Sequence, residues 1–180
     1  MIGQRATGSR PVRWRGRAEL DDEVAASADA AHAAALHLLT ARARTRTELE
    51  RRLRQRGFEP DAIAETLQRL TAVGLVDDEA LARDLASSRA AQGVDTSVIA
   101  VELRDRGIDP AVAADAAAAA VPVEDREERC RQLAGARLAK LQELSPPVQF
   151  RRLTAFLTRR GYPPEIIETV VSELVDLGRS

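Results

Sequence analysis

The sequence predicts an all-α protein, an elongated array of three tandem three-helix repeats with helix-turn-helix-like turns and about nine helices. Three observations support this fold class. The 180 residues are rich in alanine, leucine, arginine and glutamate, which favour helices, whereas aromatic residues make up only 3%. One short pattern occurs three times, about fifty residues apart. Around each copy, apolar residues recur every three or four positions, which is the spacing of an amphipathic helix.

The repeated pattern is an arginine and a glycine followed by an apolar residue and then, two positions later, a proline. Its copies lie at residues 54–63, 104–113 and 158–167, with glycines at Gly57, Gly107 and Gly161. Glycine adopts the left-handed C-cap conformation at little cost, so each glycine is expected to end a helix. Proline lacks the backbone N–H, and the N–H groups in the first turn of a helix have no intrahelical acceptor. Each proline is therefore expected to begin the next helix.

A further helix is expected upstream of each of these junctions, over residues 26–43, 78–92 and 124–144. Asp77 is expected to cap the second of them, and Thr45, Asp95 and Ser145 to cap the middle helices. The chain then divides into a disordered basic tail (1–25) and three repeats (26–75, 76–121 and 122–180). A unit of this size buries too little surface to be stable alone. The stacked units are therefore expected to share a core and form an elongated array.

The chain has a net charge of only −1, but its charges are segregated. Residues 41–57 contain seven arginines and two glutamates, and residues 145–161 contain four arginines and no acid. The final helix, expected within residues 163–178, has four acids and no base. We therefore expect a basic stripe on the middle helices that meets phosphate groups or an acidic protein groove. The alternative is a solvated helix face whose charges only keep the protein in solution.

No pattern of catalytic, cofactor-binding or metal-binding residues is found in the sequence, so an enzyme is not expected. His32 and His37 lie five residues apart, on different faces of one helix, and Cys130 has no histidine nearby in sequence. The acidic residues 77–79 suit a helix N-terminus better than a metal site. A single cysteine and the absence of a long apolar run predict a cytoplasmic protein without a membrane span, which we expect to be a monomer.

Several short motifs in the first two repeats form a pattern known from one family. The motifs are Thr45-Arg46-Thr47-Glu48-Leu49, Arg56-Gly57-Phe58, Gly74, residues 77–79, Ala82-Arg83, Ser88-Arg89 and residues 102–108. Together they resemble the RecX family of recombination regulators, over about residues 30 to 177. Leu75 and Leu81 stand where that family usually has an aromatic residue. The stretch before Ile99 lacks the basic charge that the family often has there.

The resemblance implies a protein of three three-helix repeats that binds the RecA recombinase and acts in homologous recombination, DNA repair and the SOS response. Family members lodge in the helical groove of the RecA–DNA filament. They inhibit its ATPase, co-protease and strand-exchange activities by blocking filament extension or promoting disassembly. The arginines expected to contact RecA or DNA are Arg44, Arg46, Arg51, Arg52, Arg54, Arg56, Arg83, Arg89, Arg151, Arg152, Arg159 and Arg160.

Other interpretations stay open. Arg83 and Arg89 are candidates because they lie in family motifs, and the alternative is that they pair with Asp84 or Asp78 inside the repeat. The protein as a whole could be a nonspecific DNA-binding helical repeat protein, binding single- or double-stranded DNA. It could also be a protein-binding scaffold without RecA activity. A sequence-specific helix-turn-helix reader is disfavoured, because the helices in the recognition position run acidic and phosphates would repel them.

Overall fold

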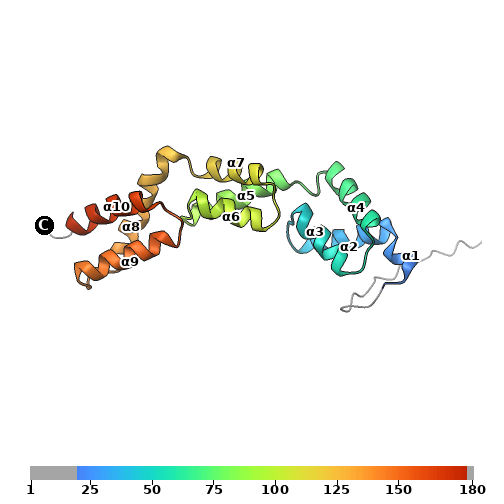
Figure 1. Ribbon diagram of the computed structural model, residues 1–180, viewed down its shortest axis with the longest axis horizontal. Helices are drawn as coiled ribbons and strands as arrows, with labels where there is room; N and C mark the ends of the chain where they lie inside the picture. The colour runs from blue at the N-terminus through green and yellow to red at the C-terminus, as the bar shows by residue number, and fades with distance from the viewer. Residues whose placement is uncertain (1–19, 178–180) are drawn as a thin grey trace, which may run out of the picture.

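The computed structural model of the chain describes residues 20–177, with side chains to residue 175. All regular structure in this part is helical, which confirms the predicted all-α class. The elements are α1 (Asp22–Ala25), α2 (Ala28–Ala41), α3 (Arg46–Gln55), α4 (Pro60–Ala72), α5 (Asp78–Ala91), α6 (Thr96–Asp105), α7 (Pro110–Ala120), η1 (Val123–Asp125), α8 (Arg126–Leu138), α9 (Pro146–Thr158) and α10 (Pro164–Leu177). Figure 1 shows the helices as successive bundles along one long axis, the predicted elongated array.

The junctions form as the repeated pattern predicts. Gly57, Gly107 and Gly161 have φ angles of 90°, 83° and 87°, in the left-handed region that favours glycine. α4, α7 and α10 each begin at a proline. Among the predicted N-caps, the Thr45 side chain accepts from the Glu48 N–H at 3.0 Å, and the Asp77 side chain accepts from Ala80 N–H at 2.8 Å.

Two of the predicted caps make no side-chain bond to their own helix. The Asp95 carboxylate lies before α6 but accepts from Arg126 Nε at 2.8 Å, because the neighbouring repeat brings a guanidinium to this buried position. Ser145 precedes α9 without a side-chain cap bond. The two residues after it are prolines, which have no N–H, and the N–H of the third, Val148, donates to the Ser145 carbonyl at 2.9 Å. Asp95 and Ser145 thus occupy the predicted N-cap positions of α6 and α9, but neither side chain makes the capping bond.

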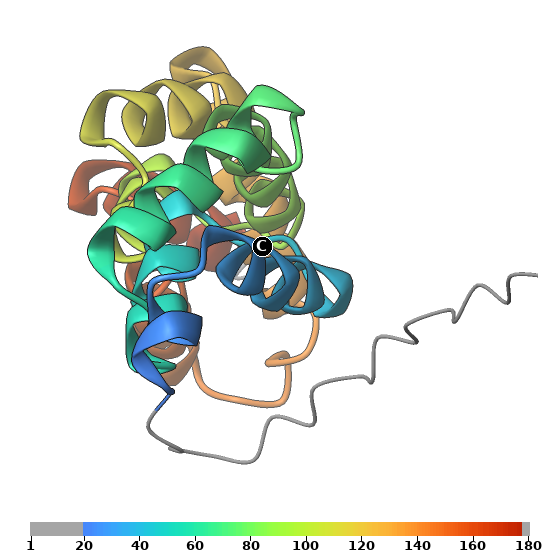
Figure 2. The ribbon, with the colours of Figure 1, turned by 90° about the vertical axis from the view of Figure 1, so that its right-hand side faces the viewer.

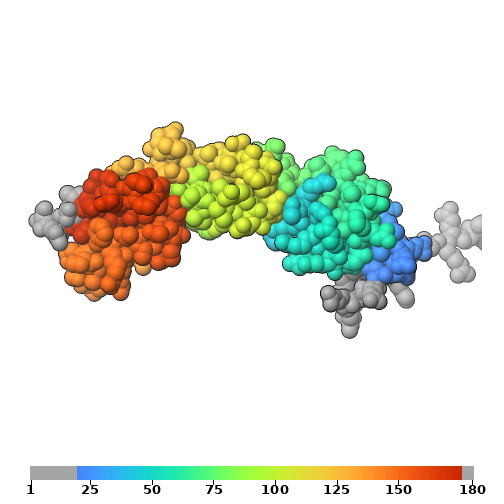
Figure 3. All heavy atoms as spheres, in the orientation of Figure 1, coloured from blue at the N-terminus to red at the C-terminus, as the bar shows by residue number. Residues whose placement is uncertain are grey.

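The buried apolar side chains form three clusters, one for each repeat, rather than the shared core that was expected. The first cluster includes Leu49 and Leu53. The second is built mainly from alanines of α5 and α7 around Ile99 and Leu103. The third includes Leu153 with Val170 and Val171, among others. The surface view shows the repeats as consecutive blocks (Figure 3).

Polar joints connect the blocks, because the three middle helices stack end to end. The main-chain carbonyls of Arg106 and Gly107, at the end of α6, accept from the hydroxyls of Thr45 and Thr47, at 2.7 and 3.0 Å. At the next joint, the Asp95 N–H donates to the Arg160 carbonyl at 2.8 Å. The Ser97 hydroxyl donates to the Gly161 carbonyl at 2.9 Å. Each joint therefore uses carbonyls that the end of a helix leaves without an intrahelical partner.

The ends of the helices differ from prediction in two places. Residues 20–25 were placed in the disordered tail, but α1 forms there and Leu20 packs against the first core. The rest of the predicted tail, residues 1–19, lies outside the described residues. The predicted helix over 124–144 is divided into η1 and the shorter α8, followed by turns.

Viewed along the array from the α1 end, the bundles overlap in projection (Figure 2).

Candidate interaction surface

The predicted site arginines of the first repeat are partly used inside that repeat. Arg44 Nε donates to the Leu38 carbonyl, in the last turn of α2, at 3.2 Å. Arg56 Nη1 donates to the Ala34 carbonyl at 3.4 Å. Arg54 pairs with Glu50 at 2.5 Å, one helical turn earlier. The Arg44 and Arg56 contacts tie the residues flanking α3 to α2, and the Arg54–Glu50 pair compensates part of the positive charge counted from the sequence.

A cluster of like charges remains at the corner between α2 and α3. Burial, and then the positive charges of Arg42, Arg52 and Arg56, lowers the pKa of Arg44. Burial and the charge of Arg52 lower the pKa of Arg56 in the same way. A guanidinium stays charged at ordinary pH, so the part of this lowering that comes from neighbouring arginines reflects mutual repulsion, in addition to the larger effect of burial. An anion placed at this corner would relieve that repulsion.

Glu48 lies beside this cluster and faces the second repeat. Its side chain is 7% exposed. It accepts from Arg106 Nε at 3.0 Å and Arg106 Nη2 at 3.2 Å, and it pairs with Arg42 at 3.5 Å. Burial acts to raise the pKa of Glu48. The hydrogen bonds and charge of Arg106, with the charge of Arg42, outweigh burial and hold it below its usual value.

The other first-repeat candidates are more open. Arg46, Arg51 and Arg52 are all exposed. The main-chain N–H of Arg46 donates to Asp78 at 2.9 Å, which ties the start of α3 to the start of α5. Arg52 has only a weak 3.5 Å contact with Gln55. Within the described part of the chain, none of these three guanidiniums pairs with an acid.

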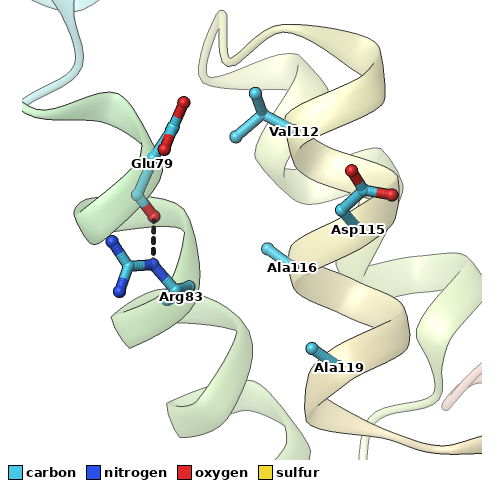
Figure 4. Close-up of a pocket in the computed structure, with 6 residues that line it drawn as sticks. All are labelled: Glu79, Arg83, Val112, Asp115, Ala116 and Ala119. Carbon is cyan, nitrogen blue, oxygen red and sulfur yellow. Dashed lines mark hydrogen bonds between the residues drawn. The ribbon is translucent and has the colours of Figure 1, made fainter.

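The two second-repeat candidates are held by their own repeat. Arg83 Nε donates to the main-chain carbonyl of Glu79 at 3.3 Å, facing a groove of about 320 Å³ between α5 and α7 (Figure 4). Arg89 binds both carboxylate oxygens of Glu102, with its Nε at 2.6 Å. Ion pairing within the repeat, with Asp84 or Asp78, was the alternative for these residues. Arg89 does pair within its repeat, but with Glu102, because α5 presents Arg89 to α6. Arg83 has no ion pair in the described part of the chain.

The third repeat also carries a basic surface without acidic partners. Arg151, Arg152 and Arg159 are exposed. None of them has an ion pair or a side-chain hydrogen bond to any residue that the structure describes. Arg160 differs, because its guanidinium donates to the Gln92 carbonyl and lies over the Phe156 ring, 4.5 Å from the centroid. α9 therefore presents arginines that no acid of the described chain neutralises.

A groove of about 600 Å³ runs between the second and third repeats beside these arginines. It is lined by Arg89, Gln92, Val94, Phe156, Arg159 and Arg160. The sequence prediction included the three arginines but missed the other three residues. Phe156 could have been found from its spacing, since it lies four residues after Arg152 and four before Arg160. The contributions of Gln92 and Val94 depend on how the repeats meet.

Chemistry other than binding finds little support in the described residues. Cys130 is fully buried, and burial raises the pKa of its thiol to about 11, so the nucleophilic thiolate is scarce at neutral pH. Over residues 20–177, no group of three or more His, Cys, Asp or Glu side chains is placed to hold a metal ion. None of the helices described is both long enough and apolar enough to cross a membrane.

The fold and this surface define a helical repeat protein whose middle helices expose basic side chains. Two family models match the chain, described as "RecX, first three-helix domain" over residues 31–70 and "RecX, third three-helix domain" over residues 124–171. The regulatory protein RecX of Amycolatopsis mediterranei is 39% identical over 137 residues, covering 76% of this chain and 78% of that protein. The regulatory protein RecX of Mycobacterium marinum is 43% identical over 148 residues, covering 80% and 84%. The chain belongs to the RecX family of regulatory proteins.

Solved structures agree with this assignment. The crystal structure of RecX from Lactobacillus salivarius matches with a TM-score of 0.69 and 25% identity, covering 83% of this chain and 97% of that one. A second crystal structure, of a regulatory protein RecX, matches with a TM-score of 0.67 at 21% identity. The second match supports the fold alone. The predicted family resemblance is confirmed.

Proposed function

We propose that this protein is a negative regulator of the RecA recombinase. It binds in the groove of the RecA–DNA filament and inhibits ATP hydrolysis, co-protease activity and strand exchange, by blocking extension or promoting disassembly. Membership of the RecX family carries this proposal, since relatives named as RecX regulatory proteins align over three quarters or more of the chain. We further propose that the protein acts in the cytoplasm, as a monomer and without enzymatic activity of its own.

The shape and charge of the array support the proposal. An elongated row of repeats can contact several neighbouring subunits of a helical filament at once. The arginines of α9 supply positive charge that is not neutralised within the described chain, so it is available to acidic protein surface or to DNA phosphates. We assign α9 a larger share of the binding than α3, because α9 contains no acidic residue, whereas Glu48 and Glu50 lie among the arginines of α3 and lower its net positive charge.

A second candidate function is nonspecific binding to DNA. It is favoured by the same observation, because unpaired arginines on a helix surface can contact phosphates without reading bases. Such binding would weaken steeply with salt and would need no RecA. The acidic side chains of α10, including Glu165 and Glu168, argue against insertion of that helix into a DNA groove.

The test measures DNA-dependent ATP hydrolysis by RecA on single-stranded DNA while this protein is added in substoichiometric amounts. One variant carries Arg151, Arg152 and Arg159 changed to glutamate. The comparison variant carries the same three-residue charge reversal at Arg51, Arg52 and Arg54 in the first repeat. We expect the unmodified protein to inhibit hydrolysis, the α9 variant to lose inhibition, and the first-repeat variant to keep a larger part of it.

Far-UV circular dichroism on all three proteins checks that the variants remain helical. If the folded, unmodified protein leaves RecA hydrolysis unchanged, RecA regulation is excluded. Binding to DNA alone, followed over a range of salt concentrations, then decides whether the nonspecific DNA-binding function takes its place.

A further inference from the structure

The groove between the second and third repeats joins surfaces from two structural units. Arg89, Gln92 and Val94 come from α5 and the loop after it, whereas Phe156, Arg159 and Arg160 come from α9 and its C-terminal turn. A ligand in this groove would touch both repeats. Its binding would therefore depend on the joint in which the Arg160 guanidinium donates to the Gln92 carbonyl.

The charge of the groove is positive and unevenly compensated. Arg89 is neutralised by Glu102 through two hydrogen bonds. Arg159 is exposed and has no acidic partner among the residues described. Around the Phe156 ring stand Arg160 at 4.5 Å and, from α8, Arg137 at 5.5 Å. Guanidinium groups so placed bind carboxylates or phosphates well, because they offer several N–H donors to one anion.

The remaining contacts of the groove argue against a nucleic-acid strand. Strands are usually held by bases that stack on open aromatic faces, but two guanidiniums already lie over the Phe156 ring. The Gln92 amide oxygen is also engaged, since it accepts from Arg89 Nη1 at 2.6 Å, while its nitrogen makes only a weak 3.5 Å contact with the Ser88 hydroxyl. The amide oxygen is therefore not available to read the edge of a base.

The lining also has an apolar part. The Phe156 side chain is only partly buried, whereas Val94, in the same wall, is 5% exposed and belongs to the second core. A phosphate backbone gains little from such surface. An extended peptide can bind both the arginines and the apolar surface of the groove. Its successive side chains point to opposite sides, so alternating residues can offer carboxylates to one and apolar groups to the other.

We propose that this groove is the docking site for an acidic segment of a protein partner, one that combines carboxylate and apolar side chains. Arg159 and Arg160 bind the carboxylates, and an apolar side chain packs against the part of the Phe156 side chain that remains exposed beside the two guanidiniums. The proposal deepens the proposed function and rests on it in one respect, because the partner bearing the segment would be the filament protein. By spanning two repeats, the bound segment also holds them in the arrangement seen here.

The test uses fluorescence anisotropy of the full-length protein with three labelled probes. The first probe is a short peptide that alternates glutamate and leucine. The second alternates glutamate and serine, with the same charge and no apolar side chains. The third is an oligothymidylate of matched charge. Each probe is titrated against the unmodified protein, Arg159→Gln and Arg104→Gln. Arg104 is the matched control because it is also exposed and has no ion pair among the described residues, but lies on α6, outside the groove and outside the candidate arginines.

We expect the glutamate–leucine peptide to bind more tightly than the glutamate–serine peptide. Arg159→Gln should weaken its binding about tenfold, or about 1.4 kcal/mol, whereas Arg104→Gln should leave it unchanged. Absence of peptide binding, or equal binding to the two variants, would overturn the proposal. Tighter binding of the oligothymidylate that is lost in Arg159→Gln would also overturn it and identify a nucleic-acid site. RecA inhibition without peptide binding would reject the docking site alone and leave the proposed function standing.

Discussion

Replacing Gly107 with alanine is expected to weaken the joint between the first and second repeats. A Cβ atom at this position would lie 2.4 Å from Thr47 Cβ and 2.7 Å from its hydroxyl oxygen, distances at which α3 or α6 must move. That movement breaks both hydrogen bonds of the joint, from Thr47 to the Gly107 carbonyl and from Thr45 to the Arg106 carbonyl. Gly74 is the matched control. It has a similar φ of 72° but no atom within 4 Å of the added Cβ.

The expected magnitudes follow from these contacts. A left-handed backbone costs alanine about 1 kcal/mol relative to glycine, and this applies to both positions. Loss of two hydrogen bonds at the joint adds about 1 kcal/mol each at Gly107. We therefore expect the free energy of unfolding to fall by about 3 kcal/mol for Gly107→Ala and by about 1 kcal/mol for Gly74→Ala.

Urea denaturation followed by circular dichroism measures both changes. A loosened joint should also broaden the transition of Gly107→Ala, because repeats that no longer support each other unfold separately. Equal losses for the two variants would refute the reasoning, since they would show that only the backbone conformation matters and that the close approach of Thr47 does not.

Two further predictions concern titratable groups. The folded-state pKa of Glu48 lies below its usual value, so its contribution to stability is present above the unfolded pKa of about 4.3 and is lost as pH falls through the folded value. Below about pH 5, the free energy of unfolding of Glu48→Gln should therefore depend less on pH than that of the unmodified protein. An identical pH dependence would contradict the role of the Arg106 contact. Cys130 should react with a thiol reagent far more slowly in the native protein than in urea at neutral pH, because it is buried and its pKa is raised to about 11. Equal rates in the two conditions would contradict its burial.

The junctions of the fold could be predicted because their causes are local. A glycine that must adopt a positive φ and a proline that begins the next helix act within a few residues of each other, so the repeated pattern contains the whole physical reason. Thr45 and Asp77 cap their helices for the same reason. Asp95 and Ser145 occupy their predicted N-cap positions, but their side chains make no capping bond. Arg126 of the third repeat binds the Asp95 carboxylate, and prolines remove the first two N–H groups of α9.

The candidate surface was predicted only as an inventory of arginines. Counting charges along a helix does not reveal that Arg89 is bound by Glu102 or that Arg160 reaches the Gln92 carbonyl. Nor does it reveal that Phe156 lies under two guanidiniums. Which arginines stay available is decided by neighbours that are often distant in sequence, and the site residues as a set remain a prediction.

The sequence by itself determined the helical class, the threefold repetition and the segregation of charge, because propensity, periodicity and capping act over short stretches of chain. The tertiary structure decided the end-to-end joints, the separate cores and the groove between the second and third repeats. The physical reason is the separation of the partners. Thr45 binds a carbonyl 61 residues away and Ser97 one that is 64 residues away, and contacts of that range exist only once the repeats have folded and stacked.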